Sequence, residues 1–321
     1  MKKTRICDLF GIRHPIIQGG MGWVASAELA AAVSNAGGLG MLSPSGGGGK
    51  DQDQVENLRN QIRKTRDLTD KPFGVNIGLE DPKHKEFVET TVKEGVRIMA
   101  TAAGSPALFT KYLKERGISV MHPAFSVRHA RRGEAEGLDA IIASGVEAGG
   151  LLSREELTTM VIVPQVADAV NIPVIAAGGI VDARGAVAAF ALGAEAVQMG
   201  TRFIATTECV AHPRYKEAIL KAIDSDTAIT GKRGMIPARC IRNKLALRVL
   251  EMDGQGVSYE EMLGFIGRGR LRMAALDGDM DEGSIFASAA SGMISEILPV
   301  KEIIQRIVED YDRVVAALGI N

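Results

Sequence analysis

The fold is decided by residues 173–203, which read P-V-I-A-A-G-G at 173–179, A-R-G-A-V-A-A-F-A-L-G at 183–193 and A-V-Q-M-G-T-R-F at 196–203. The first and last runs are almost uninterruptedly apolar, which is typical of parallel strands that are covered on both faces. The middle run is helical in composition and ends in glycine, the usual stop signal of a helix. The stretch therefore predicts a strand, a helix and a second, parallel strand.

The same unit recurs along the first two thirds of the chain. Successive apolar runs begin 21 to 34 residues apart, which is the spacing of one strand followed by one helix. Eight such runs predict an α/β fold of the TIM (β/α)8 barrel type, and an open, doubly wound sheet of about six strands is the alternative. The expected strands are 15–21, 39–42, 73–77, 97–102, 119–124, 140–145, 173–179 and 196–203.

The pattern changes after residue 203. Helical stretches such as Y-K-E-A-I-L-K-A-I at 215–223 and N-K-L-A-L-R-V-L-E-M at 243–252 flank the basic, glycine-bearing T-G-K-R-G-M-I-P at 230–237. The tail at 300–318 has the apolar spacing of an amphipathic helix. We expect residues 1–203 to form the barrel core, and residues 204–321 to form a helical cap or insert together with the closing C-terminal helix.

Composition excludes several functional classes. The chain has 38 basic and 39 acidic residues and no basic stripe, so we expect no nucleic-acid partner. The N-terminus lacks the apolar core of a signal peptide, and no apolar run reaches the roughly 18 residues of a membrane span. Three widely separated cysteines without a C-x-x-C pair indicate reduced thiols in a cytoplasmic protein. No cluster of metal ligands is visible, so we expect no metal site.

Glycine pairs mark the ends of the last two expected strands. Gly178-Gly179 ends the seventh strand and Gly200-Thr201 ends the eighth. In TIM barrels the loops after these two strands commonly hold a phosphate group, because backbone N–H groups can approach an anion closely there. Tight turns are the alternative explanation of each pair, but their joint occurrence favours phosphate binding.

The first and third strands end in groups that suit the rest of such a ligand. Q-G-G-M-G-W at 18–23 exposes backbone near the barrel axis, and Asn76 ends the third strand. Its side-chain amide can both donate and accept hydrogen bonds, although a turn or cap role is the alternative. Together with the phosphate loops, these groups suit a flat, polar-edged ring that carries a ribityl phosphate.

Six motifs, in order, resemble one family of flavin enzymes. They are P-I-I-Q-G-G-M-G-W, S-N-A-G-G-L-G, P-F-G-V-N, G-V-E-A-G-G, P-V-I-A-A-G-G-I and A-V-Q-M-G-T-R-F, between residues 15 and 203. They are similar to the FMN-dependent TIM barrels of the nitronate monooxygenase (2-nitropropane dioxygenase) family. That family includes the flavin-dependent enoyl-acyl-carrier-protein reductase II enzymes and some NAD(P)H:quinone reductases.

The resemblance implies that FMN is the cofactor and indicates where it would lie. It implies that the flavin ring is lined by Gly20, Met21 and Gly22, and that its edge is hydrogen-bonded by Asn76. It implies that the phosphate is held by Gly178, Gly179, Gly200 and Thr201. Three further residues would lie near the cofactor, namely Ser144, Gly149 and Gln198.

One position departs from the family pattern. The family's E-A-G-G stretch typically ends in a histidine that serves as a base or proton-donating partner, whereas here it is followed by Leu151. A leucine side chain cannot exchange a proton. His122, which ends the fifth strand, and Glu147 are the candidate catalytic replacements. The structural alternatives are a strand-end role for His122 and an ion pair within the loop for Glu147.

These residues lead to one preferred function and two alternatives. We expect an FMN-dependent oxidoreductase that oxidises alkyl nitronates with O2, because a nitronate is already an anion and needs no base. Reduction of an enoyl-acyl-carrier protein or a quinone with NAD(P)H is the first alternative, since hydride transfer to flavin needs no base either. A flavin-binding protein with little turnover is the second. We expect a small-molecule substrate, and the sequence leaves a homodimer open.

Overall fold

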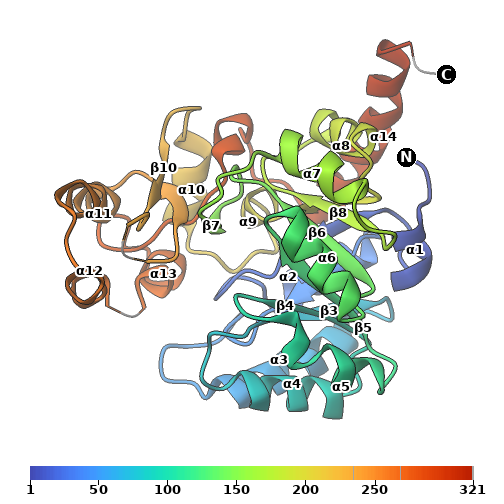
Figure 1. Cartoon of the computed structure of the whole chain (residues 1–321), viewed down its shortest axis with the longest axis horizontal. Helices are drawn as coiled ribbons and strands as arrows, with labels where there is room; N and C mark the ends of the chain where they lie inside the picture. The colour runs from blue at the N-terminus through green and yellow to red at the C-terminus, as the bar shows by residue number, and fades with distance from the viewer. Residues whose placement is uncertain (234, 268, 320–321) are drawn as a thin grey trace.

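A ring of eight parallel strands forms the centre of the computed structural model, which describes residues 1–233, 235–267 and 269–319 (Figure 1). The strand order is β1-β9-β8-β6-β5-β4-β3-β2. Leu39 closes the ring, because its carbonyl accepts from Gln18 N and its N–H donates to Ile16 O, each across 2.9 Å. The predicted TIM barrel is confirmed. Its strands are β1 (Ile16–Gln18), β2 (Gly40–Leu42), β3 (Phe73–Gly78), β4 (Ile98–Ala102), β5 (Ser119–Ala124), β6 (Ala140–Ser144), β8 (Val174–Ala177) and β9 (Ala196–Met199).

One helix covers each strand on the outside of the barrel. The helices are α2 (Ala27–Asn35), α3 (Gln54–Leu68), α4 (His84–Lys93), α5 (Thr110–Lys114), α6 (Val127–Ala135), α7 (Thr159–Ala167), α8 (Ala183–Ala191) and α14 (Val300–Ala317). The last of these, α14, packs between α8 and α2 and so completes the ring from the far end of the sequence (Figure 1). The amphipathic tail is therefore the closing helix of the barrel.

The core of the barrel has two parts because adjacent residues of a strand point to opposite faces. The inner part fills the barrel with residues such as Met41, Met121 and Ile142. The helix α1 (Arg5–Phe10) belongs to the same cluster through Ile6, Cys7 and Phe10. The outer, larger part lies between the strands and the helices.

The region after residue 203 contains a small sheet as well as helices, which corrects the expectation of a helical cap. The strands β10 (Thr227–Thr230) and β11 (Ala238–Ile241) pair antiparallel, and β11 also pairs with β7 (Gly150–Leu151). The sheet therefore joins the region after residue 203 to the loop that follows β6. The remaining elements are α9 (Thr201–Ile204), α10 (Pro213–Lys221), α11 (Lys244–Gln255), α12 (Tyr259–Ile266), α13 (Arg270–Arg272), the π-helical turn Met273–Asp277, and the 3-10 helices Pro106–Leu108 and Ala289–Met293.

None of the helices in the described ranges combines the length and the apolar character needed to cross a membrane. Within the same ranges, no three His, Cys, Asp or Glu side chains come together as a metal-binding group.

Candidate functional site

A cavity of about 490 Å³ opens at the carboxyl ends of the barrel strands. This is the end of a TIM barrel where active sites are found, and the volume lies in the usual range for small-molecule sites. The cavity brings together all eleven residues that the resemblance assigns to the cofactor, from five strand ends. They are Gly20, Met21, Gly22, Asn76, Ser144, Gly149, Gly178, Gly179, Gln198, Gly200 and Thr201.

Glycines at one end of the cavity form a cradle of free backbone donors. Gly178 and Gly179 have φ angles of +105° and +72°, which glycine adopts without strain. A Cβ atom on Gly178 would lie 2.9 Å from the Gly145 carbonyl oxygen. In the described part of the chain, no acceptor takes the backbone N–H of Gly178, Gly179 or Gly200. Such unsatisfied N–H groups at a cavity wall suit an anion.

The Thr201 side chain fixes a second segment against this cradle. Its Oγ1 accepts a hydrogen bond of 2.9 Å from the Ser288 N–H, and Ser288 also lines the cavity. Gly149 packs against the same segment so closely that a Cβ atom there would lie 2.6 Å from the Ala287 carbonyl carbon. The loop after β6, the end of β9 and residues 287–288 therefore hold one another in place around the cradle.

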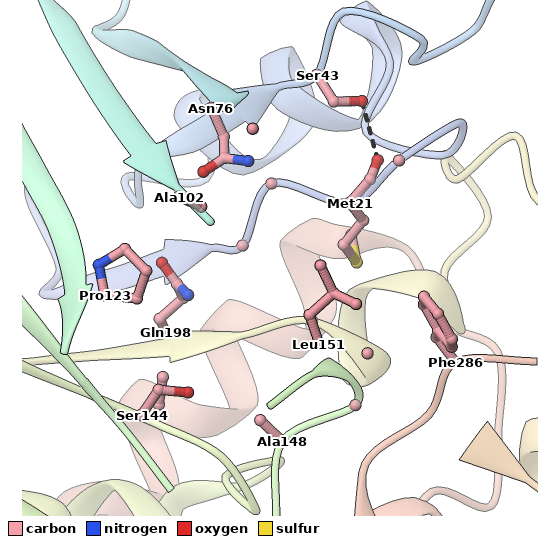
Figure 2. Close-up of a pocket in the computed structure, with 18 of the residues that line it drawn as sticks. Met21, Ser43, Asn76, Ala102, Pro123, Ser144, Ala148, Leu151, Gln198 and Phe286 are labelled. Carbon is pink, nitrogen blue, oxygen red and sulfur yellow. Dashed lines mark hydrogen bonds between the residues drawn. The ribbon is translucent and has the colours of Figure 1, made fainter. Parts of the chain in front are cut away.

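Three polar side chains face the middle of the cavity without protein partners. Asn76, Ser144 and Gln198 make no side-chain hydrogen bond with any residue of the described ranges, and Figure 2 shows them around one space. Asn76 is fixed by contact with Gly20, where a Cβ atom would lie 2.2 Å from the Asn76 Cβ. Met21 is held by a 2.9 Å hydrogen bond from Ser43 Oγ to its carbonyl oxygen (Figure 2). These groups can bind a ligand with a polar edge.

The opposite side of the cavity is apolar. Leu151 lies in β7 with 43 % of its surface exposed and lines the cavity together with Met21 and Phe286 (Figure 2). The position at which the resemblance leads us to expect a histidine is thus at the cavity wall. Its side chain offers apolar contact to a ligand and no proton.

Glu147 is not among the residues that line the cavity, although it is adjacent to one that is. Its carboxylate accepts hydrogen bonds from Thr159 N (2.9 and 3.1 Å) and from Thr159 Oγ1 (3.0 Å) at the first turn of α7. Its carbonyl oxygen accepts from Ala289 N and from Ser288 Oγ. The geometry gives Glu147 a positioning role for the loop, in place of both the proposed proton transfer and the ion pair. A carboxylate at a helix N-terminus is also stabilised by the helix dipole.

His122 points away from the cavity. The inner cluster contains Met121 and the cavity wall contains Pro123, whereas Val120 and Ala124 belong to the outer cluster. By alternation, His122 lies on the outer face of β5, where its Nδ1 is hydrogen-bonded to Thr101 Oγ1 across 2.7 Å. It is only 7 % exposed, and this burial lowers its pKa to about 4. The structural alternative for His122 therefore fits the geometry and the catalytic interpretation does not.

The buried His122 predicts a pH-dependent loss of stability. The unfolded chain binds a proton near the ordinary pKa of 6.5, but the folded chain does so only near 4, so stability falls as the pH falls between these values. We expect this residue alone to account for about 3 kcal/mol of lost unfolding free energy between pH 7 and pH 4. Urea unfolding of the wild type and of His122→Gln at both pH values measures it. If the unfolding free energy of both proteins fell equally between pH 7 and pH 4, the lowered pKa of His122 would be contradicted.

Several cavity residues are not among those identified from sequence. Phe286 and Leu271 come from the last quarter of the chain, and Ile236 comes from the segment between β10 and β11. Glu80 and Asp81 follow β3 and also line the cavity. Its position shortly after the expected third strand could have identified Glu80, because TIM barrels place their sites at the carboxyl ends of the strands.

Comparisons with known proteins identify the family of this chain. A family model described as nitronate monooxygenase matches residues 3–310. A probable nitronate monooxygenase of Staphylococcus saprophyticus is 35 % identical, covering 80 % of this chain and 83 % of its own. A (3aS,4S,5R,7aS)-5-hydroxy-7a-methyl-1-oxo-octahydro-1H-indene-4-carboxyl-CoA dehydrogenase of Mycobacterium tuberculosis is 32 % identical, covering 96 % of each chain.

Solved structures show the same fold over nearly the whole length. FabK from Thermotoga maritima superposes with a TM-score of 0.92 and 44 % sequence identity, covering 99 % of both chains. A nitroalkane oxidase from Streptomyces ansochromogenes superposes with a TM-score of 0.83 and 27 % identity, covering 97 % of this chain and 99 % of its own. On the extent of the family match and of these alignments, the chain belongs to the nitronate monooxygenase family.

Proposed function

We propose that this protein is an FMN-dependent oxidoreductase that oxidises small alkyl nitronates with O2. The observation that carries the proposal is the cavity at the carboxyl ends of the strands, where a cradle of free backbone donors and three unpartnered polar side chains face one space. FMN, when bound, supplies the redox chemistry by taking electrons from the substrate and passing them to O2. The protein's part is to bind, orient and enclose the reactants.

The residues of the cavity fit the two ends of FMN. The N–H groups of Gly178, Gly179 and Gly200 would hold the phosphate, and a side chain at Gly178 or Gly179 would press on the loop after β6 and displace these donors. Asn76, Ser144 and Gln198 offer amide and hydroxyl groups to the polar edge of the flavin ring. The close approach of Gly20 to Asn76 would place the backbone after β1 beside this amide at the ring.

The apolar wall explains how a small nitronate could be used without an imidazole. Leu151, Met21 and Phe286 exclude water from the side of the cavity that they line, and they suit the alkyl part of the substrate. A nitronate arrives already deprotonated, so its oxidation demands no base at position 151. The polar side chains opposite can orient its charged end by hydrogen bonding.

A reductase is the second candidate, and a particular comparison favours it. The 44 % identity with FabK extends over 99 % of both chains, and the dehydrogenase from M. tuberculosis is named for a CoA thioester. On this proposal NADH or NADPH would reduce the flavin, which would then reduce an enoyl thioester or a quinone. The candidate from another class, a flavin-binding protein with little turnover, predicts no reduction by any donor.

Anaerobic reduction of the FMN-reconstituted protein separates the three candidates. NADH, NADPH and ethyl nitronate are added separately, and bleaching of the flavin absorbance is followed. We expect ethyl nitronate to bleach the flavin within the mixing time or shortly after, and the nicotinamides to bleach it at least about 100-fold more slowly, a difference of about 3 kcal/mol in barrier height. Rapid bleaching by a nicotinamide alone would favour the reductase. Bound FMN that no donor bleaches would favour the binding role.

A further inference from the structure

Glu80 extends the row of cavity residues that begins with Asn76. β3 ends at Gly78, and Asn76, Gly78 and Glu80 all line the cavity, each two residues from the next. Leu79 and Glu80 form a turn, in which Asp81 N donates to the Gly78 carbonyl oxygen across 3.3 Å. Glu80 therefore lies at the same strand end as the amide that suits the polar edge of the ligand.

The Glu80 carboxyl group bends back over Gly78. A Cβ atom on Gly78 would lie 2.5 Å from one carboxyl oxygen of Glu80 and 2.8 Å from the other. Only a glycine at this position leaves room for the carboxyl group to rest against the strand end. The residue as a whole is exposed, and Glu80 and Gly78 both line the cavity.

The carboxyl group has the properties of a proton-exchanging group. Apart from its own backbone N–H, no residue in the described ranges donates a hydrogen bond to it or forms an ion pair with it. Burial and the negative charge of Asp81 raise the pKa of Glu80. The nearby cation Lys83 is engaged by Asp53 across 2.7 Å. A carboxylate with a raised pKa is a stronger base than an ordinary one.

The other ionisable groups at the cavity wall are already engaged. The Tyr215 hydroxyl donates to the Phe286 carbonyl oxygen across 2.8 Å, and burial raises its pKa far above the ordinary value. Asp81 Oδ1 accepts from the Lys83 N–H across 2.8 Å and so caps the turn that leads into α4. Among the cavity residues of the described ranges, no histidine, lysine, arginine or cysteine is present. Of the ionisable cavity residues in the described ranges, Glu80 is therefore the one left to exchange a proton.

We propose that Glu80 is the base that removes the α-proton of a neutral nitroalkane, so that the protein uses nitroalkanes as well as nitronates. The α-carbon–hydrogen bond breaks, an O–H bond forms on the Glu80 carboxyl group, and the electron pair moves onto the nitro group to give the nitronate. The partly exposed carboxylic acid then releases its proton to solvent. This inference rests on the proposed oxidation of nitronates and places the proton transfer on the β3 side of the cavity, away from Leu151.

The variant Glu80→Gln tests the proposal, because it removes the base and keeps the size of the side chain. Anaerobic flavin bleaching is followed with nitroethane and, separately, with ethyl nitronate that has been formed in advance. General acid–base groups contribute roughly 100-fold or more to a rate. We therefore expect the rate with nitroethane to fall by about 100-fold and the rate with ethyl nitronate to change less than about 2-fold. The control Glu86→Gln makes the same charge change on an exposed site of α4 that does not line the cavity.

A second variant and a pH profile keep the test independent of any folding defect. Gly78→Ala should displace the carboxyl group without removing it, and we expect it to lower the nitroethane rate while bound FMN shows that the site is intact. The wild-type nitroethane rate should rise with pH as Glu80 ionises, along a limb that Glu80→Gln lacks. Equal loss with both substrates, or an unchanged nitroethane rate in Glu80→Gln, overturns the proposal. If ethyl nitronate fails to bleach the wild type, the proposed oxidation itself fails, and the role of Glu80 falls with it.

Discussion

Gly20→Ala is expected to lower the affinity for FMN by on the order of 100-fold while the barrel still folds. The added Cβ would lie 2.2 Å from the Asn76 Cβ and 2.5 Å from its Cγ, far inside contact distance. Since β3 is fixed by hydrogen-bonded neighbours on both sides, the segment after β1 or the Asn76 side chain must move. Either shift misplaces the polar groups at the ring edge. Fluorescence titration of the apoprotein with FMN measures the loss, and we expect a stability cost of about 1–3 kcal/mol.

Gly22→Ala is the matched control for this variant. It adds the same methyl group two residues along the same cavity wall, but there the nearest atom is the Leu271 Cδ2 at 3.3 Å, the end of a flexible side chain. We expect its FMN affinity to stay within about 3-fold of the wild type, or less than 1 kcal/mol. The double variant Gly20→Ala with Asn76→Gly relieves the contact and should restore stability without restoring affinity. Equal affinities of the two alanine variants would show that the contact does not position the ligand.

The barrel could be read from sequence because each of its strands is a local pattern. The run V-I-A-A at 174–177 is wholly apolar, which is the pattern of a parallel strand that is covered on both faces, and all four residues are buried. The glycine that follows marks the end of the strand. The small sheet could not be read in the same way. T-A-I-T at 227–230 and A-R-C-I at 238–241 are short and combine polar with apolar residues, and β7 has only two residues. These strands depend on pairing between segments far apart in the chain, and no local pattern records that pairing.

The glycine loops of the site were predictable because the fold brings every strand end to one place. Gly178 and Gly200 therefore line the same cavity although they lie 22 positions apart in the sequence. The direction of a side chain at a strand end was not predictable with the same ease. A shift of one residue moves a side chain from one face to the other, so Pro123 lines the cavity and His122 does not. Glu147 shows a further difficulty, because its hydrogen-bond partner Thr159 lies beyond an irregular loop.

Removal of the Glu147 carboxylate is expected to destabilise the fold and the cofactor site together. Thr159 N and Thr159 Oγ1 both donate to it, and Thr159 Oγ1 also lies 2.9 Å from the carbonyl oxygen of Gly178 in the cradle. Hydrogen bonds to a charged group contribute about 1.5–3 kcal/mol each. We expect Glu147→Ala to lower the unfolding free energy of the apoprotein by about 3 kcal/mol, measured by urea unfolding. The control Glu156→Ala removes an exposed partner of Lys232 and should cost less than about 1 kcal/mol.

The same variant distinguishes a residue that positions the ligand from one that only supports the fold. A bound ligand raises the unfolding free energy by an amount that grows with the ratio of its free concentration to its dissociation constant. If Glu147 holds the cradle in its binding conformation, the loss caused by Glu147→Ala must be larger with saturating FMN than without it. A 30-fold weaker affinity, for example, adds about 2 kcal/mol. Equal losses in the two conditions would mean that the hydrogen bonds to Thr159 hold α7 in place while the cradle keeps its shape without them.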